Sequence, residues 1–127
     1  MNSLNRDHDP DAPAIARPLA RIAQIEEGGF LEVEAMLDGG DAESLILHRD
    51  GDVVRAWLNV CPHAGRRLDW APGRFLKSKA GELVCAVHGA TFELQGGVCV
   101  AGPCRGDSLR AVAIEIVDGD VRLRTSG

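Results

Sequence analysis

Residues 61–65 read Cys-Pro-His-Ala-Gly, and residues 85–89 read Cys-Ala-Val-His-Gly. Each segment holds one thiolate donor and one imidazole donor, the pairs being Cys61 with His63 and Cys85 with His88. Two sulfur and two nitrogen ligands on two loops suit a tetrahedral zinc ion, or a 2Fe-2S cluster in which two histidines replace two cysteines on one iron. A usual zinc finger takes both thiolates from one loop and both imidazoles from another. Because each loop here mixes the donor types, the spacing favours the iron-sulfur cluster and leaves zinc as the alternative.

In these segments the chain resembles the Rieske iron-sulfur proteins, from about Leu19 to Arg124. A Gly102-Pro103 pair follows where that family has a proline loop shielding its cluster. The resemblance implies one 2Fe-2S cluster, with the two cysteines on the buried iron and the two histidines on the outer iron. The connection between the two motifs, 21 residues from His63 to Cys85, is a few residues longer than in a typical Rieske ferredoxin. We expect the extra length in a loop around residues 73–81.

The rest of the chain reads as short strands. Apolar and polar residues alternate over residues 31–37, and Asp-Gly pairs at 50–51 and 118–119 separate apolar runs, as in β-hairpins. Gly96-Gly97 separates two further runs in the same manner. These patterns predict an all-β domain of antiparallel strands. The resemblance adds a β-sandwich base with a small inserted cluster-binding subdomain at about residues 61–106.

Residues 1–18 contain three aspartates and three prolines and little apolar content, so we expect a flexible tail before a single domain at 19–127. The chain shows no signal peptide and no long apolar run, which predicts a soluble cytoplasmic protein. A net charge of -5 with few aromatic residues disfavours nucleic-acid binding.

Four side chains outside the ligand motifs carry separate expectations. Cys99 and Cys104 are expected to be reduced structural thiols, with a disulfide or a redox or second-metal role as alternatives. Trp57 is expected in the core. Trp70 is expected to pack, either plainly or over the cluster. His48 lies in a strand beside a turn and is expected to be exposed or structurally bonded.

The resemblance implies a soluble one-electron carrier of the Rieske ferredoxin type. It would pass electrons from a flavin-dependent reductase to a terminal enzyme, with a Rieske non-haem iron oxygenase favoured, and would be a monomer when free. The alternative is the small Rieske-like subunit of a larger redox complex, such as a nitrite reductase. The chain itself is not expected to be an enzyme, because a mononuclear iron site needs two more histidines and a carboxylate, and only His8 and His48 remain.

The resemblance also implies a low reduction potential. High-potential members of the family have a serine and a tyrosine whose hydroxyl groups bond to cluster and ligand sulfur atoms just after the second ligand loop. The matching positions here are Ala90 and Phe92, and the chain has no tyrosine. The disulfide that links the ligand loops in those proteins would need cysteines at positions that hold Arg66 and Val87.

Overall fold

The structure is a computed structural model that describes residues 18–37, 41–62, 65–86 and 89–124. Over these residues it confirms the all-β prediction, with no α-helix and a single 3-10 turn, η3 (Ile22–Gln24). The strands are β1 (Ala20–Arg21), β2 (Phe30–Met36), β3 (Ala42–Asp50), β4 (Val53–Leu58), β5 (Leu76–Lys77), β6 (Leu83–Val84), β7 (Thr91–Phe92), β8 (Cys99–Ala101), β9 (Ile114–Val117) and β10 (Asp120–Leu123). They form three antiparallel sheets, ordered β2-β3-β4, β1-β10-β9 and β5-β6-β7-β8.

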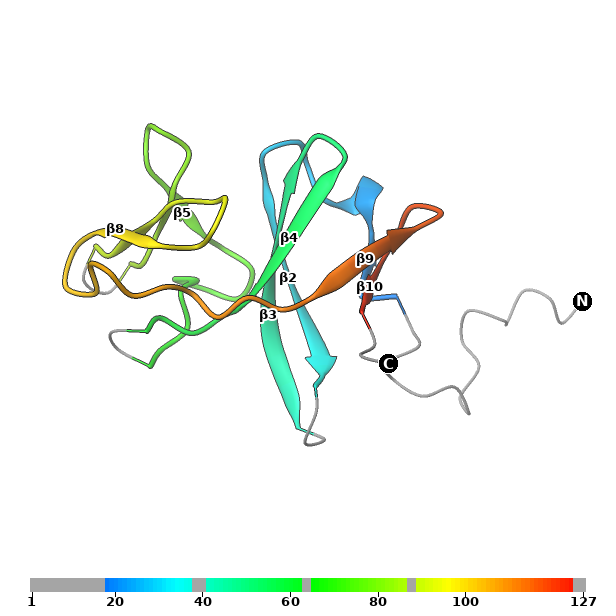
Figure 1. Cartoon of the computed structure of the whole chain (residues 1–127), viewed down its shortest axis with the longest axis horizontal. Helices are drawn as coiled ribbons and strands as arrows, with labels where there is room; N and C mark the ends of the chain where they lie inside the picture. Colours follow the sequence, from blue (N-terminus) through cyan, green and yellow to red (C-terminus); the bar gives the residue numbers. More distant parts are fainter. Residues whose placement is uncertain (1–17, 38–40, 63–64, 87–88, 125–127) are drawn as a thin grey trace, which may run out of the picture.

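The central sheet β2-β3-β4 is the middle layer of the molecule (Figure 1). The predicted Asp50-Gly51 hairpin is confirmed, since Asp50 pairs with Val53 across the β3–β4 turn. Adjacent side chains of a strand point to opposite faces, yet the run from Leu45 to His48 is buried throughout. Both faces of β3 are therefore covered by other parts of the chain.

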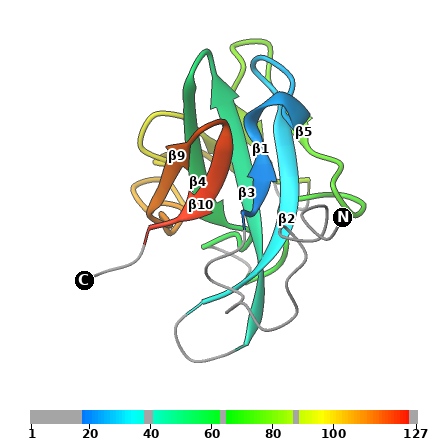
Figure 2. The same ribbon diagram turned by 90° about the vertical axis from the view of Figure 1, so that its right-hand side faces the viewer.

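One face of the central sheet packs on the sheet β1-β10-β9, which lies in front of it in Figure 2. Leu47 of β3, Ala56 of β4 and Val121 of β10 belong to one buried cluster between these two layers. The predicted Asp118-Gly119 hairpin joins β9 to β10, with Val117 paired to Asp120. These two sheets make the predicted sandwich base.

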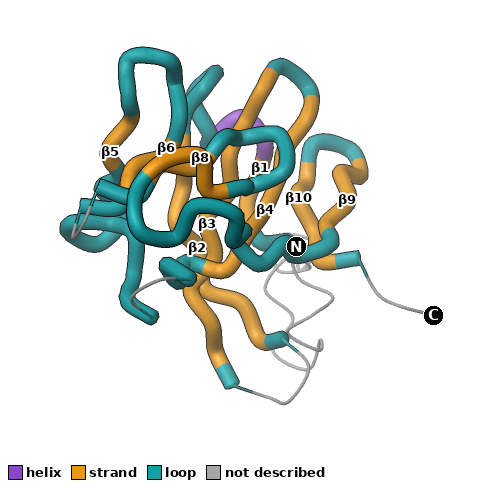
Figure 3. The backbone as a smooth tube through the Cα atoms, turned by 60° about the vertical axis from the view of Figure 1, so that its left-hand side comes forward, coloured by secondary structure: helices purple, strands orange, loops and turns teal. Residues whose placement is uncertain are grey.

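The other face of the central sheet meets the four-stranded sheet β5-β6-β7-β8, at the end of the molecule away from β9 and β10 (Figure 1). Its strands are short, and long loops connect them (Figure 3). Ile46 and Trp57 of the base share one buried cluster with Leu83 and Phe92 of this sheet. Full burial of each such apolar side chain contributes roughly 1.5–3 kcal/mol, so this cluster holds the loop-rich sheet to the base.

Two expectations about this end of the molecule need adjustment. The segment 73–81, expected as a loop, contains β5, which pairs with β6. The predicted hairpin around Gly96-Gly97 is confirmed, but β7 is shorter than its apolar run suggested, and β8 begins one residue later than expected. The Glu93 carboxylate closes this turn by accepting hydrogen bonds from Gly96 N and Val98 N, which lower its pKa.

The predicted N-terminal tail lies almost entirely outside the described residues. In the part of the chain that the structure does describe, no helix reaches the length and hydrophobicity that a membrane crossing requires.

Candidate metal centre

The first ligand loop leaves β4 and begins at Cys61. Cys61 N donates to Arg66 O at 2.7 Å, and Gly65 N donates back to Cys61 O at 2.8 Å. The loop is therefore closed on itself at the cysteine. Gly65 has φ of +67°, a left-handed conformation that side chains other than glycine adopt at a cost.

The second ligand loop, between β6 and β7, repeats this geometry position by position. Cys85 N donates to Ala90 O at 2.7 Å, and Gly89 N donates to Cys85 O at 2.9 Å. Gly89 has φ of +72°. In both loops the cysteine N–H bonds to the carbonyl five residues later, and the glycine four residues later bonds to the cysteine carbonyl. Two segments 24 positions apart in the sequence thus form the same loop, a match that sequence spacing alone did not reveal.

Both loops place their cysteine inside the protein. Cys61 and Cys85 are each 1% exposed, and both belong to the buried cluster that contains Trp57 and Phe92. His63 and His88 lie outside the described residues, so the structure does not test their positions. The donor chemistry of the described part fits an iron-sulfur cluster, because two thiolates come from matching, closed loops inside an apolar shell.

A buried polar network fixes the first ligand loop to the base. Leu68 N donates to Asn59 Oδ1 at 2.8 Å, and Asn59 Nδ2 donates to Ser44 Oγ at 3.1 Å. Ser44 Oγ in turn donates to Glu32 Oε2 at 2.8 Å. Asn59, two residues before Cys61, is 1% exposed and has no access to water. These hydrogen bonds therefore satisfy its buried amide group.

Asp69 is a second carboxylate in the same network. Arg67 forms a bidentate pair with it, from Nε at 2.9 Å and NH2 at 2.7 Å, and Gly73 N donates to it at 3.1 Å. Burial alone would raise the pKa of Asp69, but the hydrogen bonds from Arg67, Gly73 and Asn59 outweigh burial and lower it. The pairing raises the pKa of Arg67, which also lies 3.4 Å from Glu32. No sequence pattern indicated this network, because its members are isolated polar residues on three different segments.

The Gly102-Pro103 segment packs against the second ligand loop. A side chain at Gly102, which has φ of +96°, would come within 2.8 Å of Ala90 Cα. Only glycine permits this close approach of the two backbones. Cys99 and Cys104, at the two ends of the segment, are free and buried thiols. Burial, followed by the contact with Cys99, raises the pKa of Cys104 to about 12.

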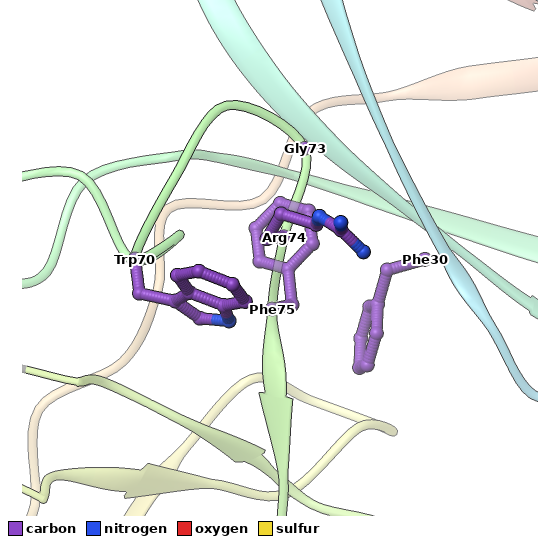
Figure 4. A pocket seen from close by; sticks show the side chains of 5 residues that line it. All are labelled: Phe30, Trp70, Gly73, Arg74 and Phe75. Atoms are coloured by element: carbon purple, nitrogen blue, oxygen red, sulfur yellow. The ribbon is translucent and has the colours of Figure 1, made fainter.

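The predictions for the two tryptophans have different outcomes. Trp57 is a core residue, 2% exposed, as predicted. Trp70 is 55% exposed, so the prediction of plain packing in the core is wrong, and packing over the cluster stays a prediction. Its ring lies beneath the Arg74 guanidinium at 5.7 Å and, with Gly73, Phe75 and Phe30, lines a pocket of about 260 Å³ (Figure 4).

His48 is buried, 7% exposed, against the ring of Phe30, so the exposed alternative is wrong, whereas a backbone hydrogen bond at Gly28 supports the structurally bonded one. Its Nδ1 has no hydrogen-bond partner among the described residues. Burial is the main cause that lowers its pKa. No sequence signal distinguished this histidine from an exposed one, because its burial comes from segments far away in the chain.

Comparison with known proteins shows what this chain is similar to. A model of the Rieske [2Fe-2S] domain matches residues 17–116. The oxygenase subunit of glycine betaine monooxygenase from Chromohalobacter salexigens is 33% identical over 81 residues. That match covers 64% of this chain but 16% of the relative, so the chain corresponds to a small part of that subunit.

Solved structures share the fold over most of the chain. The ferredoxin of carbazole 1,9a-dioxygenase from Nocardioides aromaticivorans IC177 superposes with a TM-score of 0.65 at 24% identity, covering 86% of this chain and 96% of the ferredoxin. A chain from the complex of reduced oxygenase and oxidised ferredoxin in carbazole 1,9a-dioxygenase gives a TM-score of 0.64 at 20% identity, covering 87% of this chain and 94% of its own. At these identities the structures establish the common fold.

Proposed function

Since this chain belongs to the Rieske [2Fe-2S] domain family, we propose that it is a one-electron carrier whose cluster is held by Cys61, His63, Cys85 and His88. The observation that carries the proposal is the pair of matching closed loops, each presenting one buried cysteine to the same apolar region. A cluster with two thiolate and two neutral imidazole ligands takes up one electron more readily than one with four thiolates, whose charge is more negative.

The chain's own residues define how such a group would be held. The cysteine sides of both loops face the interior, where Trp57, Leu68 and Phe92 exclude water. The described residues nearest to the histidines in the sequence are exposed, namely Pro62, Gly65, Ala86 and Gly89. This asymmetry supports a cluster with its cysteine-bound iron inside and its histidine-bound iron toward solvent, where an electron can leave for a partner.

The proposed partners are a flavin-dependent reductase as donor and a Rieske non-haem iron oxygenase as acceptor. Two solved structures that share this fold contain ferredoxins of carbazole 1,9a-dioxygenase systems, and one of these is a complex of ferredoxin with oxygenase. The free carrier would be a cytoplasmic monomer, and no residue of this chain would act as a catalyst.

Ligand substitution tests the assignment. The purified protein should contain two irons and two acid-labile sulfides per chain and be red-brown. Cys61→Ser and His88→Ala should abolish the visible spectrum and the iron content, because each leaves an iron position open. Cys104→Ala and His48→Ala serve as matched controls and should retain both. A His88→Ala protein with an unchanged spectrum would refute the ligand set, and a colourless wild-type protein with bound zinc would refute the cluster.

A second reading, a subunit of a larger redox complex, is favoured by the relative in which the matching region is only 16% of the length. Size-exclusion chromatography of the natively expressed protein separates the two. The carrier reading predicts a free monomer that a flavin reductase reduces rapidly, whereas the subunit reading predicts stable co-purification with a larger protein.

A further inference from the structure

Two thiols meet beneath the Gly102-Pro103 segment. Cys99 and Cys104 are each 2% exposed, and their sulfur atoms lie 2.6 Å apart. The four residues between them, Val100 to Pro103, are all exposed. Residues 100–103 are thus exposed, while the two cysteines that flank them bring their sulfur atoms into contact inside the protein.

Backbone hydrogen bonds hold this loop closed. Cys99 N donates to Asp107 O at 2.7 Å, Asp107 N donates to Cys104 O at 2.8 Å, and Gly106 N donates to Cys99 O at 3.2 Å. Each cysteine therefore takes part in the same small network. Opening of these bonds would expose the two buried sulfur atoms to a reagent in solution.

From this geometry we infer that Cys99 and Cys104 are a reversible disulfide site. A low-molecular-weight disulfide such as oxidised glutathione is the oxidant. One cysteine sulfur attacks the glutathione disulfide, releasing one glutathione thiol and forming a mixed disulfide. The second cysteine sulfur then displaces the other glutathione, forming the Cys99–Cys104 bond. The two cysteine protons end on the two glutathione molecules, and an excess of reduced glutathione reverses both steps.

The ligand loop controls access to this site. Gly102 lies directly against Ala90, and Ala90 O accepts the hydrogen bond from Cys85 N. Opening of the Gly102-Pro103 segment must separate it from the second ligand loop, so a metal centre that orders this loop will slow oxidation of the dithiol. This coupling rests on the proposed cluster, whereas formation of the disulfide does not.

Thiol mapping tests both parts. The full-length protein, with its cluster and after removal of the cluster by a chelator, is incubated with defined ratios of oxidised to reduced glutathione, quenched with acid, alkylated and mapped by peptide mass spectrometry. We expect a single bond between residues 99 and 104 that reverses on return to reduced glutathione. It should form roughly tenfold or more slowly in the cluster-bound protein than in the stripped protein. A Cys99→Ala/Cys104→Ala variant should gain no intramolecular bond in its cluster-bound form.

Each other outcome counts against the inference. Complete alkylation of both residues at every ratio, or glutathione adducts that never resolve to the internal bond, overturns the disulfide site. Equal rates in the two forms overturn the coupling. Iron is assayed in the same samples: a preparation that never contains iron counts against the proposed function, and the disulfide site is then judged on that protein alone.

Discussion

Ala90 lies where the second ligand loop meets the Gly102-Pro103 segment, and it is fully buried. Its side chain offers no hydrogen-bond donor to the region that would hold the cluster. A reduced cluster carries one more negative charge than an oxidised one, so a donor at this position stabilises the reduced state more than the oxidised state.

Ala90→Ser should therefore raise the reduction potential. A net hydrogen bond of about 1 kcal/mol corresponds to roughly 40 mV for a one-electron couple. Without that donor, the wild-type potential should lie near the low end of the Rieske range, at roughly -150 mV. Redox titration of both proteins measures the difference. Ala80→Ser, which adds a hydroxyl at an exposed site outside the ligand loops, should leave the potential unchanged. A positive wild-type midpoint at neutral pH, or an unaltered potential in Ala90→Ser, would contradict the argument.

His48 gives a second prediction at the scale of one residue. Its pKa is lowered from 6.5 mainly by burial, with Lys77 and Arg55 adding to the effect and Asp50 and a backbone hydrogen bond at Gly28 opposing it. The unfolded chain therefore binds a proton more readily than the folded protein. The neutral ring contributes its full stability above about pH 6.5, and this contribution is lost as the pH falls through the lowered folded pKa.

Replacement of His48 by phenylalanine removes this titration and keeps an aromatic ring beside Phe30. The free energy of unfolding, measured by denaturant titration from pH 7.5 to pH 5.5, should fall more steeply in the wild type than in His48→Phe. The difference between the two curves cancels the titration of all other groups. Parallel curves would show that His48 binds protons equally in both states.

Among the elements, the long hairpins follow directly from local sequence. Asp50-Gly51 and Asp118-Gly119 specify tight turns by themselves, and the flanking apolar runs pair across them. β5 and β6 have two residues each, too few for any periodic pattern, and they exist because Leu83 packs into the core. The cysteines of the metal centre could be predicted from their spacing. The hydrogen bonds that hold the first ligand loop could not, because they join residues from separate segments.

That network gives the prediction for the first ligand loop as an element. The side chain of Asp69 is 1% exposed and accepts hydrogen bonds from Arg67 and Gly73. Asp69→Ala leaves these donors without their acceptor, so the free energy of unfolding should fall by about 2–3 kcal/mol. Asp52→Ala, at an exposed acid in the β3–β4 turn, is the matched control and should change it by less than about 0.5 kcal/mol. Equal effects in the two variants would show that this network does not stabilise the first ligand loop.

At the scale of the whole molecule, the charges are unevenly divided. Residues 61–80 contain five basic side chains and one acid, a net charge of +4, so the rest of the chain carries -9 to reach the total of -5. Of the basic residues, Arg67 is bound to Asp69 and Lys77 donates to Gly28 O, while Arg66 and Lys79 are exposed. The segment leads from the first ligand loop toward β5, at the end of the molecule away from β9 and β10 (Figure 1). We therefore expect a positive field near the first ligand loop, although the protein as a whole is acidic.

Small charged oxidants distinguish this local field from the overall charge. The reduced protein should transfer its electron to hexacyanoferrate(III), an anion, at a rate that falls as salt is added, because the Debye length shrinks from about 30 Å at 0.01 M to about 3 Å at 1 M. The net charge of -5 alone would repel this anion, and the rate would then rise with salt. Arg66→Glu should slow the reaction at low salt and flatten its salt dependence, and a cationic cobalt(III) oxidant should show the opposite trends. Arg124→Glu, an equal charge reversal just after β10, is the control and should have little effect, since it lies at the far end of the molecule. A rate that rises with salt, or equal effects of the two reversals, would mean that only the total charge steers the encounter.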